Sequence, residues 1–138
     1  MSGINWLAVA AAVIGVTALG AFWYSPAFLG TRWMKTINLN PEDISKQAAI
    51  KGMIISIGTA VISIVTMAVL MKLFALNTGL EGLLFGLAVG TGLVGATQLS
   101  NMAYEQEKIF ELFLISGGYR IVSFLFIGWL LGFWQGEI

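Results

Sequence analysis

Four stretches of the chain are apolar over about the length that a helix needs to cross a bilayer. They run over residues 4–24, 47–73, 79–101 and 110–134. About 20 apolar residues in a helix span a hydrocarbon core of ~30 Å, and a bilayer admits only helices and closed barrels. We therefore expect an all-α membrane protein in which residues 1–138 form one domain, a bundle of four transmembrane helices.

The composition supports this class and excludes several kinds of function. Only 10% of the residues are charged and 58% are hydrophobic, whereas about a quarter of the residues in a soluble domain are charged. The formal net charge is zero, so no nucleic-acid partner is indicated. The chain has neither His nor Cys, which removes their metal sites and their nucleophile systems. We expect no metal, no cofactor and no catalytic residues.

Aromatic residues mark the end of the first span. Trp and Tyr favour the headgroup region of a membrane, and a proline disfavours helical angles at the residue before it. Between residues 29 and 37 the apolar side chains fall on one helical arc, which fits either a short interfacial helix or an ordinary connecting loop. The interfacial motif consists of Trp23, Tyr24, Ser25, Pro26 and Trp33.

Two sequence patterns predict helix starts. Asn40, Pro41 and the two acids that follow predict that the second helix begins at Pro41. Thr78 and Glu81 have the spacing of a capping box, so the third helix should open there.

Small residues recur at helical spacing in all four spans, in the first of them at Ala8, Ala11, Gly15 and Ala18. Such residues let helices approach closely in a membrane, and a ridge can also serve contacts between chains. The third span carries a second ridge, Ala88, Gly92 and Ala96, which would suit an oligomer. The polar stripe on the second span could instead line a transport pathway. The helix-packing candidates are Gly52, Ser56, Thr59, Ser63, Gly82, Gly86, Gly90, Gly128 and Gly132.

Arg120 is the only charged residue between Leu112 and Trp134. If the last helix enters the bilayer near Leu112, Arg120 lies roughly 12 Å into a core about 30 Å thick. A guanidinium keeps its proton, and leaving it in lipid costs from about 2.5 to more than 10 kcal/mol. Arg120 should therefore be sheltered by protein or by a bound molecule.

The spacing around Arg120 predicts a polar site. Ser116 and Ser123 share its helical face, and its side chain should lean toward the N-terminal end of the helix, where the third span ends. In a structural role the guanidinium would bond carbonyls and amide side chains and fix helix register. In a functional role it would face a cavity and bind an anionic solute or lipid. The candidate polar or ligand site is Arg120, Tyr119, Ser116, Ser123, Gln98 and Asn101.

Basic residues predict the orientation. Four spans place Arg32, Lys35, Lys46, Lys51 and Lys108 on one side, and only Lys72 on the other. By the positive-inside rule the basic side is cytoplasmic and both termini are outside.

Two regions resemble a known family. The sequences FWYSPAFLGTRWMK (residues 22–35) and YEQEKIFELFLISGGYRIVSFLFIGWLLGFW (residues 104–134) resemble the signature regions of the bacterial membrane proteins grouped as domain of unknown function 1761. The resemblance implies a four-span protein of the bacterial inner (plasma) membrane whose activity is unassigned.

Three function classes follow from these observations. The first is a non-enzymatic binding or structural bundle that self-associates or joins a membrane complex, with membrane lipids around it. The second is a carrier of small solutes or lipids that acts as a homo-oligomer with an anion-binding arginine. An enzyme fits least well, because intramembrane chemistry generally needs a paired base, nucleophile or metal.

Overall fold

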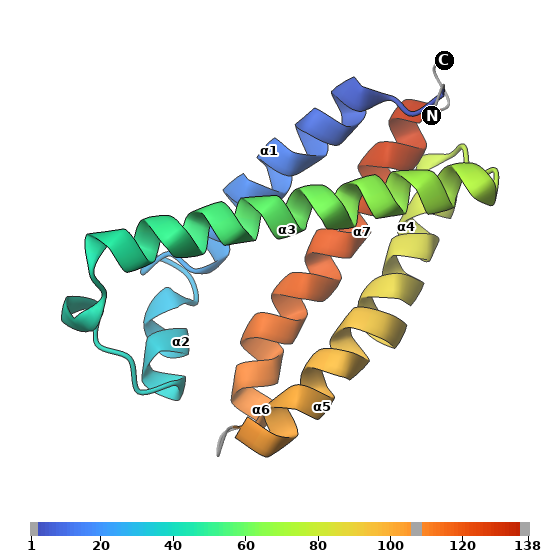
Figure 1. The fold of residues 1–138 in the computed structure, drawn as a ribbon. Helices are drawn as coiled ribbons and strands as arrows, with labels where there is room; N and C mark the ends of the chain where they lie inside the picture. Colours follow the sequence, from blue (N-terminus) through green and yellow to red (C-terminus); the bar gives the residue numbers. More distant parts are fainter. Residues whose placement is uncertain (1–2, 106–108, 136–138) are drawn as a thin grey trace.

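The computed structural model describes residues 3–105 and 109–135, and within these ranges all regular structure is helical (Figure 1). The long helical runs are α1 (Trp6–Trp23), α3 (Lys46–Leu73), the run of α4 (Gly79–Ala88), η2 (Val89–Gly95) and α5 (Ala96–Glu105), and the run of α6 (Ile109–Leu112), η3 (Phe113–Gly117) and α7 (Gly118–Gln135). Two short helices, α2 (Gly30–Thr36) and η1 (Pro41–Asp43), connect α1 to α3. Four helices in this part of the chain are long and apolar enough to cross a membrane. The predicted all-α, four-span fold is confirmed.

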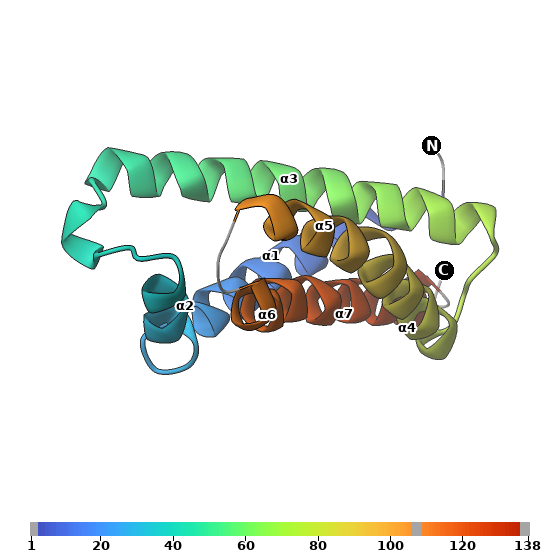
Figure 2. The same cartoon turned by 90° about the horizontal axis from the view of Figure 1, so that it is seen from below.

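Three of the long runs lie side by side, and α3 crosses them. Figures 1 and 2 show α1, α7 and the α4–α5 run packed together, with α3 lying across one face at a steep angle. The start of α1, the end of α7 and the connection from α3 to α4 lie at one end of the molecule (Figure 1). The short helices α2 and α6 lie at the other end, called here the α2 end. Successive helices thus reverse direction, as four membrane crossings require.

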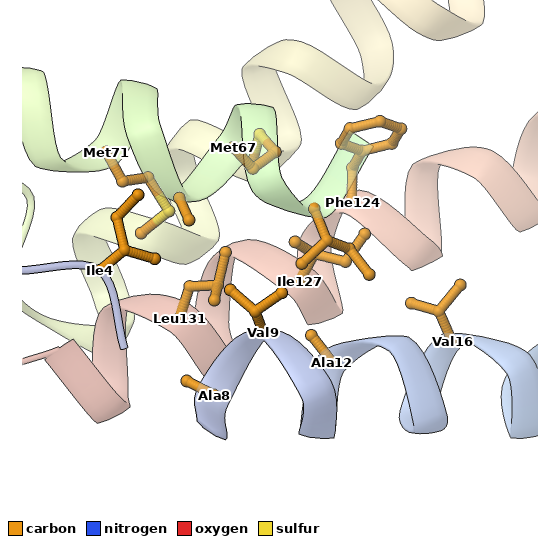
Figure 3. Close-up of a cluster of buried hydrophobic side chains, with 12 residues drawn as sticks. Ile4, Ala8, Val9, Ala12, Val16, Met67, Met71, Phe124, Ile127 and Leu131 are labelled. Carbon is orange, nitrogen blue, oxygen red and sulfur yellow. The ribbon is translucent and has the colours of Figure 1, made fainter. Parts of the chain in front are cut away.

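The core lies where α1, α7 and the C-terminal half of α3 meet (Figure 3). Small residues such as Ala8 and Ala12 let α1 approach its neighbours, and the larger Met67 and Leu131 fill the space between the helices. The buried residues of this cluster are Ile4, Ala8, Val9, Ala12, Val16, Ile64, Met67, Ala68, Met71, Phe124, Ile127 and Leu131.

Glycines bring α4 and α7 to backbone distance. A Cβ atom on Gly82 would collide with the carbonyl of Gly128, and a Cβ on Gly128 would collide with the carbonyl of Gly82. Gly86 meets the carbonyl of Phe124 in the same way, and Gly132 meets that of Thr78. Gly90, farther along in η2, approaches Phe124 and Ile121. The predicted packing glycines of the third and fourth spans therefore share one interface.

The N-terminal half of α3 does not pack in the same way. Residues 46–59 are all exposed, and burial starts only near Ile64. A Cβ atom on Gly52 or on Gly58 would meet nothing within 4 Å. Gly52, which we expected at a helix contact, thus lies open within the described chain.

Two helix boundaries differ from their predictions, and one helix start agrees. The second long helix begins at Lys46 instead of Pro41, because Ile44 is extended and the Ser45 side chain caps the helix by accepting from the amide of Ala48. The third run continues beyond residue 101 to Glu105. The capping box of Thr78 and Glu81 is confirmed, since both of its hydrogen bonds are present. Lys108, which entered the prediction of orientation, lies outside the described residues.

Candidate functional site

The two regions that carry the family resemblance meet in space at the end of α1. The indole Nε1 of Trp23 donates a hydrogen bond of 2.9 Å to the carbonyl of Ile115, in η3. The ring of Tyr24 packs edge to face against Trp33 and against Tyr119, with 5.3 Å between ring centroids in each pair. The interfacial motif and the last span therefore form one aromatic cluster.

A tight turn after α1 holds this cluster in place. The carbonyl of Ser25 accepts from the amides of Phe28 and Gly30, and the carbonyl of Trp23 accepts from the amide of Leu29. A Cβ atom on Gly30 would collide with the carbonyl of Tyr24, so only glycine fits there. The turn brings α2, and with it Trp33, back against the end of α1.

A cavity of about 370 Å³ lies beside the cluster, between α1, α3 and α7. Its buried lining comes from Val16, Ser123, Phe124 and Ile127. Around these lie residues of all three helices and Tyr24, many of them small or hydroxyl-bearing. The remaining lining residues are Thr17, Gly20, Ala21, Tyr24, Met53, Ser56, Ile57, Thr59, Ala60, Ser63, Tyr119 and Arg120.

Among the residues that the structure describes, Arg120 is the only charged one that lines this cavity, and it is exposed. It lies close to the middle of the candidate span Ile109–Trp134. Within the described residues it makes no ion pair and no hydrogen bond; its guanidinium carbon lies 5.8 Å from the ring centroid of Tyr119. A cation–π contact at this distance contributes about 0.5–2 kcal/mol. Arg120 is thus a cation within a candidate membrane span that has no acidic partner in the part of the chain that the structure describes.

Most hydroxyl groups around the cavity already donate within the protein. Thr17 donates to the carbonyl of Val13, Thr59 to that of Ser56, and Ser123 to that of Tyr119. The Tyr119 hydroxyl donates to the carbonyl of Val16 at 3.3 Å, which joins α7 to α1. Two serines of α3, Ser56 and Ser63, donate no hydrogen bond to the described residues. The guanidinium and these two hydroxyls are therefore among the cavity-facing donors that are not used within the described residues.

The structure brings together only part of the predicted polar site. Tyr119, Arg120 and Ser123 line the cavity, whereas Ser116 is buried beside Tyr24, within hydrogen-bonding reach of its hydroxyl. Gln98 and Asn101, on α5, do not line the cavity.

The difference has two physical causes. The α4 side of α7 is filled by the glycine contacts, so Arg120 faces α1 and α3 instead of α5. In addition, residues Phe113–Gly117 form a π-helix. The extra residue in its turn changes the direction of Ser116 relative to Arg120 from that expected in a regular α-helix.

The sequence analysis missed some of the site. Ser56, Thr59 and Ser63 were expected at a helix contact, yet they line the cavity opposite Arg120. The alternative interpretation of these residues, as the lining of a polar transport pathway, is the one that pointed to a cavity. An ion pair of 2.8 Å between Arg32 Nε and Glu111 Oε1 joins α2 to α6, and no local spacing indicated it.

Fold and site together define a multi-pass membrane protein with a cavity of mixed polar and apolar lining between three of its helices. The sequence model of the family described as Protein of unknown function (DUF1761) matches residues 7–132. The chain belongs to this family. No curated protein and no solved structure matches the chain.

Proposed function

We propose that this protein is a non-enzymatic binding protein of the membrane that holds an anionic group in the cavity at Arg120. The main support is the environment of the Arg120 guanidinium. It lines the cavity, is exposed and has no carboxylate partner among the described residues. In a hydrocarbon core such a charge costs several kcal/mol, about 2.5 or more. An anion bound beside it would remove much of that cost.

The chemistry of the cavity suits an oxyanion. A guanidinium offers five N–H donors in a planar fork, which matches a carboxylate or a phosphate. Ser56 and Ser63 add two hydroxyl donors from α3, across the cavity from α7. The lining includes no Asp or Glu, so it offers neither a competing negative charge nor a carboxylate that could act as a general base. These features support binding over catalysis.

Thermal unfolding in a neutral detergent tests this proposal. The probes are inorganic phosphate, glycerol 3-phosphate and an anionic lipid, phosphatidic acid, each titrated against wild type, Arg120→Gln and Arg120→Lys. Arg32→Gln is the matched control, because it removes an arginine that does not line the cavity.

Binding of at least one probe should raise the unfolding temperature of wild type and of Arg32→Gln. Arg120→Gln should bind that probe about tenfold to a hundredfold more weakly, because hydrogen bonds to charged groups contribute about 1.5–3 kcal/mol. Arg120→Lys should lie between them. If every variant responds equally, or no probe stabilises wild type, the proposal is wrong.

A carrier is the alternative function, and one observation favours it. One side of the cavity is formed by the N-terminal half of α3, where residues 46–59 are exposed instead of packed. A segment held so loosely could change position as a bound anion enters or leaves. Uptake of a labelled probe into proteoliposomes, in wild type but not in Arg120→Gln, would favour transport over binding alone.

We also propose that the protein self-associates. The ridge of Ala88, Gly92 and Ala96 is exposed, and a Cβ on Gly92 would meet nothing within 4 Å. Small residues of this kind promote helix contacts between chains in a membrane. Gly92→Leu should shift the detergent-solubilised protein toward monomer in light scattering, whereas Gly58→Leu, at an equally open glycine, should not. Equal behaviour of the two variants would argue against this ridge.

The proposed location is the bacterial inner membrane, with the α2 end in the cytoplasm and the termini outside. Arg32, Lys35, Lys46 and Lys51 lie toward the α2 end, and Lys72 lies at the opposite end of α3. The positive-inside rule supports this orientation.

A further inference from the structure

The rim of the Arg120 cavity is apolar where it meets the surroundings. Met53 and Ile57, on α3, line the cavity and are 61% and 36% exposed. Ala21, on α1, is an exposed lining residue on the opposite side. All three lie within helices that are long and apolar enough to span a membrane. In helices that span a membrane, exposed apolar side chains face lipid, so an opening lined by these three residues leads sideways toward the bilayer.

The cavity lining has a polar part and an apolar part. Arg120, Ser56 and Ser63 supply polar donors, whereas Val16, Phe124 and Ile127 supply buried apolar surface. A small hydrated anion would use only the donors and would leave the apolar surface without a partner. A molecule with an anionic head and an apolar chain would contact both.

Positive charge lies toward the α2 end of the same helices. Lys35, Lys46 and Lys51 are exposed and belong to α2 and the first turns of α3, whereas Arg32 is paired with Glu111. Basic residues near a membrane surface attract anionic headgroups. The rim residues Met53 and Ile57 follow Lys51 along α3, so the opening lies inward of this basic surface.

We infer that the ligand of the Arg120 cavity is an anionic amphiphile, which enters sideways from the leaflet at the α2 end. Its phosphate or carboxylate head lies against Arg120 and the serines of α3, and its chain leaves between α1 and α3, past Met53 and Ile57. This inference rests on the anion-binding function proposed above and names the class of molecule that carries the anion.

The test separates the head, the chain and their combination. Wild-type protein in phosphatidylcholine nanodiscs is unfolded thermally with phosphatidic acid in the bilayer, with glycerol 3-phosphate in the buffer, or with diacylglycerol in the bilayer. Phosphatidic acid has both parts, glycerol 3-phosphate has only the anionic head, and diacylglycerol has only the chains. The same measurements on Arg120→Gln and Arg120→Lys show whether a response depends on the guanidinium.

Phosphatidic acid should raise the unfolding temperature of wild type, and Arg120→Gln should need at least about ten times more of it for the same rise. Glycerol 3-phosphate and diacylglycerol should have little effect. An equal, Arg120-dependent response to glycerol 3-phosphate would overturn the amphiphile and leave the anion-binding function standing. An equal response to diacylglycerol, or no Arg120-dependent response to either phosphate, would overturn both.

A change at the rim gives a second test that leaves Arg120 intact. Met53→Gln places a polar group at the opening, and Ile54→Gln is its control, because Ile54 is 66% exposed but does not line the cavity. Met53→Gln should weaken the response to phosphatidic acid several-fold more than Ile54→Gln does. Equal effects of the two variants would contradict entry past Met53.

Discussion

The indole of Trp23 donates to the carbonyl of Ile115 over 2.9 Å, and this bond fixes the end of α1 against η3. Ile115 lies in a π-helical segment, Phe113–Gly117, where the backbone ladder departs from the regular α-helix. Tyr119 and Arg120 follow that segment directly. The position of the cavity arginine is thus coupled to the side chain of the last residue of the first span.

Replacing Trp23 should therefore cost stability through one lost donor. Trp23→Phe keeps an aromatic ring and should lower the free energy of unfolding by about 0.5–1.5 kcal/mol, the usual contribution of a hydrogen bond. Unfolding in mixed micelles of increasing dodecyl sulfate content measures the change. Trp33→Phe is the control, because Trp33 contacts Tyr24 through its ring. If both variants lose the same stability, the Ile115 bond contributes nothing of its own.

The α4–α7 contact should not tolerate a methyl group. Gly82→Ala places a Cβ against the carbonyl of Gly128 and should destabilise the protein by about 1–3 kcal/mol, as overpacking usually does. Gly58→Ala, at an open helical glycine, should be neutral or slightly stabilising, because alanine favours helix by about 1 kcal/mol. The same unfolding titration compares the two. A neutral Gly82→Ala would show that the two helices lie farther apart than described.

The Arg32–Glu111 pair should contribute little to stability despite its short distance. The side chains are 68% and 36% exposed, and exposed ion pairs typically contribute about 0.2–1 kcal/mol. A double-mutant cycle with Arg32→Ala and Glu111→Ala should give a coupling in that range that shrinks as salt is added. A coupling well above it, insensitive to salt, would mean that the pair is shielded from water, for example by a neighbouring chain.

Cysteine labelling should reveal the orientation. The chain has no native cysteine, so Lys35→Cys and Asn77→Cys each introduce a single thiol. In intact cells an impermeant maleimide should label Asn77→Cys from outside and should reach Lys35→Cys only after lysis. The reverse pattern would show that the α2 end faces outward.

Local patterns predicted the helices, whereas the site depended on contacts that such patterns do not encode. Hydropathy over about 20 residues is enough to find a membrane span, and the Thr78 capping box needs only four consecutive residues. The packing glycines could also be predicted, but their partners could not, because apolar surfaces of all helices are equivalent in lipid. For that reason residue spacing could not predict how α3 crosses the other helices. It therefore could not predict which helices Arg120 faces.

Arg120 shows this limit in detail. Its charge inside an apolar stretch predicted a cation that must be sheltered by protein or by a bound molecule. In the structure this cation lines the cavity between α1, α3 and α7. The expected lean of its side chain toward the N-terminal end of the helix placed Gln98 and Asn101 near it, but they do not line the cavity. Ser56 and Ser63 do, because they lie on the part of α3 that borders the cavity, before α3 packs against α7 from Ile64 onward.

A high-resolution density map of the protein, purified from its native membrane without exchange of bound molecules, tests the central claim most directly. We predict density for an anionic group within hydrogen-bonding distance of the Arg120 guanidinium, continuing as a chain past Met53. A guanidinium paired with a carboxylate of the protein, or a cavity filled only by water, would contradict the account.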